Sequence, residues 1–160
     1  MKLLLTILIF VFAPGTSLAI ELSLEDEAKI SNILIQTMQG QKQYQTLFLI
    51  CKSSCELSNA REKAFKKIIK KLQIRSVSVE QWQALISEDP DQLYFVNQDF
   101  EQEHSSGVCL SNSFSQVRKG CLAGMQLIKT NPRIQMNLNT MKDRKLSFPS
   151  SLLSLVELVE

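Results

Sequence analysis

The stretch Thr46-Leu47-Phe48-Leu49-Ile50-Cys51 decides the fold class, because it is a short and continuous apolar run. A run of this kind is typical of a strand that is buried on both faces of a parallel sheet. Leu93-Tyr94-Phe95-Val96 has the same character, and shorter strands are predicted at 74–78 and 108–110.

Helices are predicted between these strands from the spacing of apolar residues and from capping residues. They cover 24–39, about 59–71, and a short segment that begins after Ser78, whose capping box includes Gln81. Because strand and helix alternate, the sequence indicates βαβ units and a largely parallel sheet.

The pattern changes in the last part of the chain. Apolar residues alternate at 125–127 and again at 134–138, on either side of Thr130-Asn131-Pro132-Arg133, which predicts a β-hairpin. A final helix is predicted at Ser150–Val159, with Pro149 in a favourable position at its start. The expected class is one compact α/β domain: a mixed, mostly parallel sheet flanked by helices, with a C-terminal hairpin and a terminal helix.

Residues 1–19 predict a signal peptide. A positive charge precedes an apolar run at 3–13, and Ser17-Leu18-Ala19 places small side chains where a signal peptidase cleaves. The apolar run is shorter than the roughly 20 residues that cross a bilayer. We therefore expect cleavage after Ala19, and 20–160 working as a single domain in a bacterial periplasm.

Charge and composition exclude some classes of function. Eighteen Lys and Arg oppose sixteen Asp and Glu, so the chain is not a strongly basic nucleic-acid binder. A single histidine excludes a metal centre built mainly from histidines. Residues 56–75 contain seven basic and two acidic residues, whereas residues 88–103 contain six acidic residues and no basic one. The basic stretch is interpreted either as a solvated helix face or as a surface for anionic lipid or an acidic partner.

All four cysteines lie in the part of the chain that is expected to be exported, where disulfides form. Cys109 and Cys121 flank eleven residues, and a bond between them would stabilise the fold by about 3 kcal/mol. Cys51 and Cys55 are spaced one residue further apart than the usual redox pair, and they are the second disulfide candidate. Crossed pairings and free thiols are the alternatives.

No motif in the sequence carries catalysis. His104 lies in the polar segment 98–107, which we expect to be a solvated loop, and no serine or cysteine near it has a nucleophile signature. The glycines form no loop that would hold a phosphate. We therefore expect a protein that is not an enzyme and that has no cofactor and no metal.

The predicted final helix is apolar around almost its whole circumference. Such a helix is either buried in the core or shared with a partner. Leu152, Leu155 and Val156 are our candidates for partner binding, in a homodimer or in a groove of another protein, and docking on the core is the alternative.

Gly120–Leu158 shows a distinctive order of features: a glycine before an apolar strand, a hairpin, Asn137-Leu138, and Lys145-Leu146-Ser147-Phe148 leading into a Pro-Ser-Ser-Leu-Leu ending. This order resembles the C-terminal part of the YfiR-like family, and the strands at 46–51 and 93–96 lie where that family has strands. The cysteines do not fall on the family's positions, so no disulfide pairing is taken from it.

The resemblance implies a periplasmic regulator without catalytic activity. It would bind the periplasmic domain of an inner-membrane diguanylate cyclase, repress the cyclase and so modulate cyclic-di-GMP signalling. An outer-membrane lipoprotein would release the repression by sequestering the regulator, and a homodimer is implied too.

Two other classes of protein are weighed against this regulator. A periplasmic thiol–disulfide protein needs an exposed thiolate at Cys51 or Cys55, and a small-solute sensor or transport accessory needs a pocket.

Overall fold

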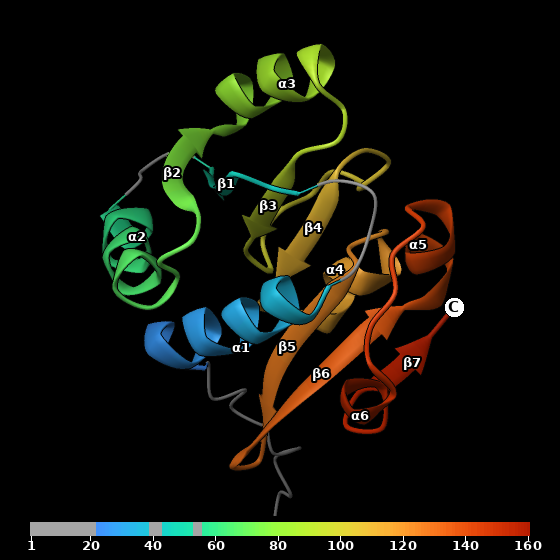
Figure 1. The fold of residues 1–160 in the computed structure, drawn as a ribbon. Coiled ribbons are helices and arrows are strands. Elements are labelled where there is room, and N and C mark those ends of the chain that lie inside the picture. Colours follow the sequence, from blue (N-terminus) through green and yellow to red (C-terminus); the bar gives the residue numbers. More distant parts are fainter. Residues whose placement is uncertain (1–21, 39–42, 53–55) are drawn as a thin grey trace, which may run out of the picture.

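A computed structural model describes residues 22–38, 43–52 and 56–160, and it confirms the predicted α/β class (Figure 1). In chain order the elements are α1 (Leu24–Thr37), β1 (Thr46–Cys51), α2 (Glu56–Ile68), β2 (Gln73–Ser78), α3 (Val79–Glu88), β3 (Leu93–Val96), β4 (Val108–Ser111), α4 (Phe114–Arg118), β5 (Ala123–Ile128), β6 (Asn131–Asn137), α5 (Leu138–Asp143), α6 (Ser150–Leu153) and β7 (Glu157–Val159).

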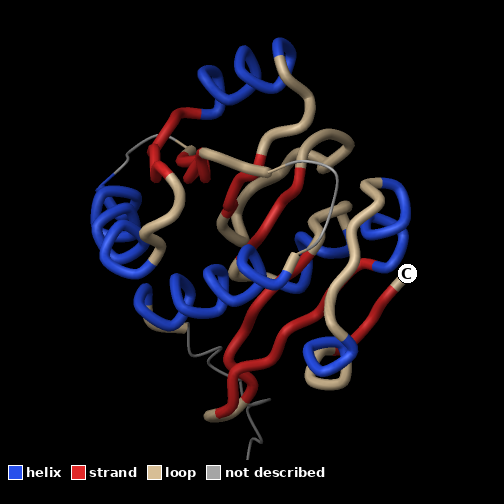
Figure 2. Tube along the Cα trace, viewed as in Figure 1, coloured by secondary structure: helices blue, strands red, loops and turns tan. Residues whose placement is uncertain are grey.

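One sheet of seven strands runs through the molecule in the order β2-β1-β3-β4-β5-β6-β7 (Figure 2). The first five strands in that order are mutually parallel, as predicted. Leu47 of β1 pairs with Ile74 of β2 on one side and with Leu93 of β3 on the other. β5 and β6 form the predicted antiparallel hairpin, and β7 pairs parallel to β6.

The two faces of the sheet bury different side chains, because successive residues of a strand point to opposite faces. On β1, Leu47 and Leu49 join the cluster that packs against α1 and α2. Phe48 and Ile50 join a second cluster that includes Trp82 of α3, whose ring centroid lies 5.9 Å from that of Phe48. The sheet therefore lies between two helical layers.

The helix starts follow the capping residues. The Ser23 side chain accepts a hydrogen bond from the backbone N–H of Asp26 at the start of α1, and the Ser78–Gln81 capping box is present at the start of α3. α2 begins at Glu56, three residues before the predicted start. The hairpin turn is also tighter than predicted: Ile128 already pairs with Asn131, so Lys129 and Thr130 alone connect β5 to β6, and Lys129 takes a positive φ of 60°.

The prediction of one helix from Ser150 to Val159 is wrong in extent. The helix ends at Leu153, and Glu157–Val159 forms β7 along the outer edge of β6. A short run of leucine and valine suits a helix or a strand equally well, and pairing with the edge of β6 decides between them.

Candidate functional site

A hollow of about 430 Å³ lies where β3 and β4 end, beside the N-terminus of α1. Its size falls in the range of roughly 300–1,000 Å³ that small-molecule sites occupy. Ligands of parallel α/β sheets bind at this edge, outside the carboxyl ends of the strands. We call it the carboxyl-edge hollow. Its lining consists of Leu22, Ser23, Leu24, Glu27, Arg61, Asn97, Gln98, Asp99 and Asn112.

A buried ion pair between α1 and α2 borders this hollow. Arg61 Nε donates to Glu27 Oε2 at 2.7 Å, and Arg61 Nη2 donates to Glu27 Oε1 at 3.3 Å. The Glu27 side chain is 1% exposed and that of Arg61 is 10% exposed. The guanidinium also lies over the ring of Phe95, 5.4 Å from its centroid. Because this ion pair is bidentate and buried, it fixes the position of both charged groups at the wall of the hollow.

Asn112 completes the cluster from the end of β4. Its Nδ2 donates to Glu27 Oε1 at 3.1 Å, which fixes the orientation of the amide. The Asn112 Oδ1 atom is buried and has no hydrogen-bond partner in the part of the chain that the structure describes. A buried acceptor left unpaired costs about 1–3 kcal/mol, and a donor added at this oxygen would offset that cost.

A second hollow, of about 540 Å³, lies beside α5 and is lined by polar residues that include Asn137, Thr140 and Arg144. These groups are bonded within the protein. Asn137 Nδ2 donates to the Val117 carbonyl, Thr140 Oγ1 donates to the Gly120 carbonyl, and Arg144 Nη2 donates to the carbonyl of Ser105. Their hydrogen bonds hold α5 against the loops, which is a structural role.

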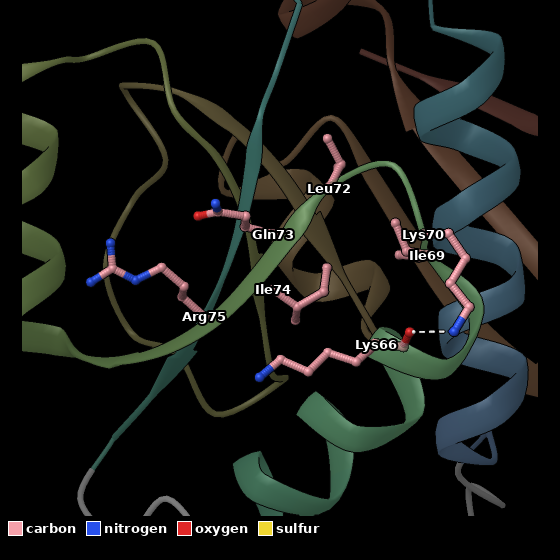
Figure 3. Close-up of a pocket in the computed structure, with 7 residues that line it drawn as sticks. All are labelled: Lys66, Ile69, Lys70, Leu72, Gln73, Ile74 and Arg75. Carbon is pink, nitrogen blue, oxygen red and sulfur yellow. Dashed lines mark hydrogen bonds between the residues drawn. The ribbon is translucent and has the colours of Figure 1, made fainter.

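The basic stretch borders a third hollow, of about 360 Å³, between the end of α2 and β2 (Figure 3). Lys66, Lys70 and Arg75 are exposed around it, whereas Ile69 and Ile74 are buried. Lys70 Nζ donates to the Lys66 carbonyl at 3.1 Å. This arrangement fits a solvated face of an amphipathic helix, which is the first of the two interpretations of the basic stretch.

The three partner-binding candidates occupy different environments. Leu152 is 9% exposed and belongs to the core, and Val156 packs against the core with part of its surface. Leu155 is 78% exposed, and Leu158, on the adjacent β7, is 40% exposed. The structure therefore leaves Leu155 at the surface, adds Leu158, and takes Leu152 into the interior.

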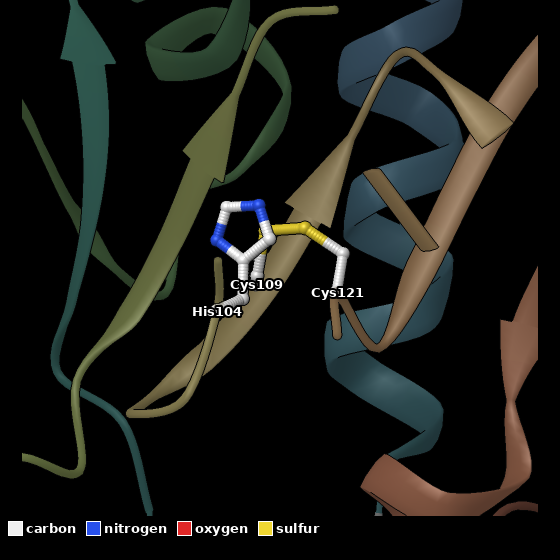
Figure 4. Close-up of side chains that lie close together, drawn as sticks. All are labelled: His104, Cys109 and Cys121. Atoms are coloured by element: carbon white, nitrogen blue, oxygen red, sulfur yellow. A yellow bond between two sulfur atoms is a disulfide. The ribbon is translucent and has the colours of Figure 1, made fainter. Parts of the chain in front are cut away.

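The predicted disulfide between Cys109 and Cys121 is confirmed, with a Cα–Cα distance of 4.5 Å (Figure 4). Cys51 is also disulfide-bonded, and Cys55, its predicted partner, lies outside the described residues. His104 sits beside the Cys109 and Cys121 sulfurs, all within 4.8 Å of one another. This group is no metal site, because the sulfurs are bonded to each other and are not thiolates.

His104 is not in a solvated loop, so that prediction is wrong: the residue is 7% exposed. Its Nε2 lies 2.9 Å from Gln116 Oε1, and its Nδ1 lies 3.0 Å from Tyr94 Oη. Gln116 Nε2 donates to the Phe100 carbonyl, which turns Oε1 toward the imidazole and assigns the proton to Nε2. Burial lowers the pKa of His104, with the Gln116 hydrogen bond opposing and the Lys119 charge adding to this effect.

Two observations bear on the expected location. A structural disulfide is typical of a protein that works in an oxidising compartment. None of the helices among the described residues is long and apolar enough to cross a lipid bilayer. The predicted signal peptide at 1–19 lies outside the described residues.

The carboxyl-edge hollow was not predicted, because its residues come from four separate segments of the chain. Arg61 and Glu27 are 34 positions apart and carry no motif. One signal was present in the sequence. Asn97 comes directly after the strand predicted at 93–96, and Asn112 comes two positions after the strand predicted at 108–110. Such positions meet at the carboxyl edge of a parallel sheet.

Comparisons with known proteins support the fold alone. No family model matches the chain, and no curated protein matches it. Among solved structures, the chain is similar to the ABC domain from Streptococcus pneumonia, solved in complex with L-Trp, with a TM-score of 0.62 and 11% sequence identity. The match covers 85% of this chain and 62% of that one, so this chain spans less than two thirds of that domain.

Proposed function

We propose that the protein is an exported regulator without catalytic activity, which acts by binding another protein through the surface beside β7. Leu155 supports this proposal most strongly, because it is 78% exposed, and Leu158, three residues further along the chain, is a second exposed large apolar side chain. We call Leu155, Leu158 and the outer edge of β7 the β7 surface. Exposed apolar side chains that gather beside an open strand edge are typical of a protein–protein contact.

The resemblance to the YfiR-like family supplies the proposed partner, the periplasmic domain of an inner-membrane diguanylate cyclase. Repression would work by differential affinity. The regulator binds the inactive conformation of the cyclase more tightly than the active one and so shifts the population toward it. An outer-membrane lipoprotein that competes for the regulator would restore cyclase activity. A homodimer through the β7 surface is a further proposed state.

The test replaces Leu155 and Leu158 together by Glu and measures co-purification with a tagged membrane cyclase that is encoded beside this protein. The unchanged protein should bind the cyclase and lower cellular cyclic-di-GMP, and the double variant should do neither. Ile33→Glu is the matched control, since Ile33 on α1 is 50% exposed and lies outside the β7 surface. Binding that survives in the double variant, with circular dichroism showing an intact fold, would overturn the role of the β7 surface.

A thiol–disulfide enzyme is less well supported. Attack on a disulfide needs an accessible, low-pKa thiolate. Cys109 and Cys121 are 1% and 0% exposed, and Cys51 is 6% exposed. These cysteines are suited to holding the fold together.

Small-solute sensing is the second candidate function. The carboxyl-edge hollow supplies the pocket that this function needs, at the edge where α/β folds bind ligands. The similar ABC domain was solved with L-Trp, which is consistent with solute binding on this kind of fold. Native mass spectrometry of the protein purified from its own envelope tests this function, and a stoichiometric ligand is the expected result.

A further inference from the structure

We infer that the carboxyl-edge hollow binds a small zwitterion of the α-amino-acid type, with its ammonium group at Asn112 and Asp99 and its carboxylate at Arg61. This inference rests on the second candidate function. It is independent of the β7 surface, since none of the residues that line the hollow belongs to that surface.

The acceptors of the hollow select a ligand that carries N–H donors. Asn112 gives its Nδ2 proton to Glu27, and its buried Oδ1 has no partner among the described residues. Asp99 is an exposed carboxylate on the same lining. Glu27 and Asp99 together outnumber the single base Arg61, so the charge of the lining favours a ligand with a cationic donor group.

The hollow also offers donors for an anionic group. The hydrogen bonds of Arg61 to Glu27 use Nε and Nη2, and Nη1 makes no hydrogen bond to any described residue. Guanidinium N–H groups match carboxylate oxygens in geometry and charge.

Apolar groups complete the lining. Leu22 is 8% exposed and Leu24 is partly buried, and both border the hollow beside the charged groups. An aliphatic side chain can pack against these leucines while the ammonium and carboxylate groups bond to Asn112, Asp99 and Arg61. A ligand with all three parts at one carbon is an α-amino acid.

L-leucine and two analogues test this chemistry by isothermal titration at low ionic strength. Isoamylamine is leucine without its carboxylate, and isocaproic acid is leucine without its ammonium group. L-leucine should bind. Each analogue should bind with an affinity at least about tenfold lower, since each loses charge-assisted hydrogen bonds. Equal binding of either analogue, or no binding of L-leucine, would overturn the zwitterion inference.

Variants locate the binding. Asp99→Asn should weaken L-leucine binding about tenfold with an unchanged fold, because Asp99 is exposed, and Asn112→Leu should abolish it. Asp143→Asn is the matched control, since it removes the same charge from the hollow beside α5. An unchanged affinity in Asp99→Asn would overturn the site. A stoichiometric solute of other chemistry, found by native mass spectrometry, would leave the second candidate function standing while the zwitterion inference fails.

Discussion

Among single residues, His104 forms a buried hydrogen-bonded group that packs against Tyr94 and Phe100 of the second core cluster. The imidazole stacks on Phe100 with ring centroids 5.4 Å apart, and Tyr94 and Gln116 bond its two nitrogens. Burial also raises the pKa of Tyr94, so this phenol stays protonated and can donate to Nδ1. In the neutral imidazole with its proton on Nε2, Nε2 donates to Gln116 Oε1 and Nδ1 accepts from Tyr94 Oη, whose single proton also faces the Ser106 carbonyl at 3.1 Å.

The buried imidazole predicts a loss of stability on acidification. Because the folded-state pKa of His104 lies below the ordinary value of 6.5, its contribution is present above that value and is lost as the pH falls through the folded pKa. NMR titration of this single histidine should give the lowered pKa directly. Urea unfolding from pH 7.5 to pH 5 should show a smaller decline in His104→Gln than in the unchanged protein, and equal declines would contradict the prediction.

At the scale of the elements, the two edge strands of the sheet are treated differently. On β2, the Glu62 carboxylate accepts a hydrogen bond from the Ser76 N–H at 3.0 Å, and Gln81 Oε1 accepts from the Ser78 N–H at 3.0 Å. These side chains occupy the backbone donors that point away from β1. An edge protected in this way resists pairing with other chains, whereas the short β7 at the opposite edge lies beside exposed leucines.

Glu62→Ala should therefore promote self-association. The substitution removes the acceptor at the Ser76 N–H, and we also expect a loss of about 1 kcal/mol in the free energy of unfolding. Sedimentation velocity should show larger species at high protein concentration. Glu62→Gln, which keeps an acceptor oxygen, should behave like the unchanged protein, and Glu101→Ala controls for the loss of a carboxylate. A monomeric Glu62→Ala variant would contradict the role of this side chain in protecting the edge.

The sequence predicted most elements because each has a local signal, such as the apolar run of β1 or the capping box at Ser78. It failed where the decision depends on distant contacts. Glu157 to Val159 has no local preference that separates helix from strand, and pairing with the edge of β6 makes it a strand. His104 looked solvated because its neighbours in sequence are polar, although its neighbours in space are aromatic. The carboxyl-edge hollow depends wholly on such distant contacts.

At the scale of the whole molecule, the sheet separates two surfaces with different chemistry. The carboxyl-edge hollow combines charged groups, Glu27, Arg61 and Asp99, with the apolar Leu22 and Leu24, whereas Leu155 and Leu158 give the β7 surface an apolar character. The Cys109–Cys121 disulfide links β4 to the residues just before β5 and so fixes the middle of the sheet. The two proposed binding activities can therefore be removed separately.

Removing this disulfide should lower the stability of the whole domain. The bond closes a loop with a sequence separation of 12, for which the chain-entropy model gives about 3 kcal/mol. Urea unfolding of the Cys109→Ala, Cys121→Ala double variant should show this decrease. Because both sulfurs are buried, dithiothreitol should reduce the bond in urea and leave it intact in the native protein. Rapid reduction under native conditions, without unfolding, would contradict this account.

The position of Gln116 inside the loop closed by Cys109 and Cys121 couples two chemical equilibria. Gln116 Oε1 accepts the Nε2 proton of the imidazole inside the buried core, and the covalent loop holds Gln116 in place. Burial lowers the pKa of His104, so a loop opening that admits water to the imidazole raises its proton affinity. By thermodynamic reciprocity, protonating the imidazole then eases that opening. Acid and reductant should therefore act on this core synergistically, and the midpoint for reduction should depend on pH in the range where the imidazole titrates.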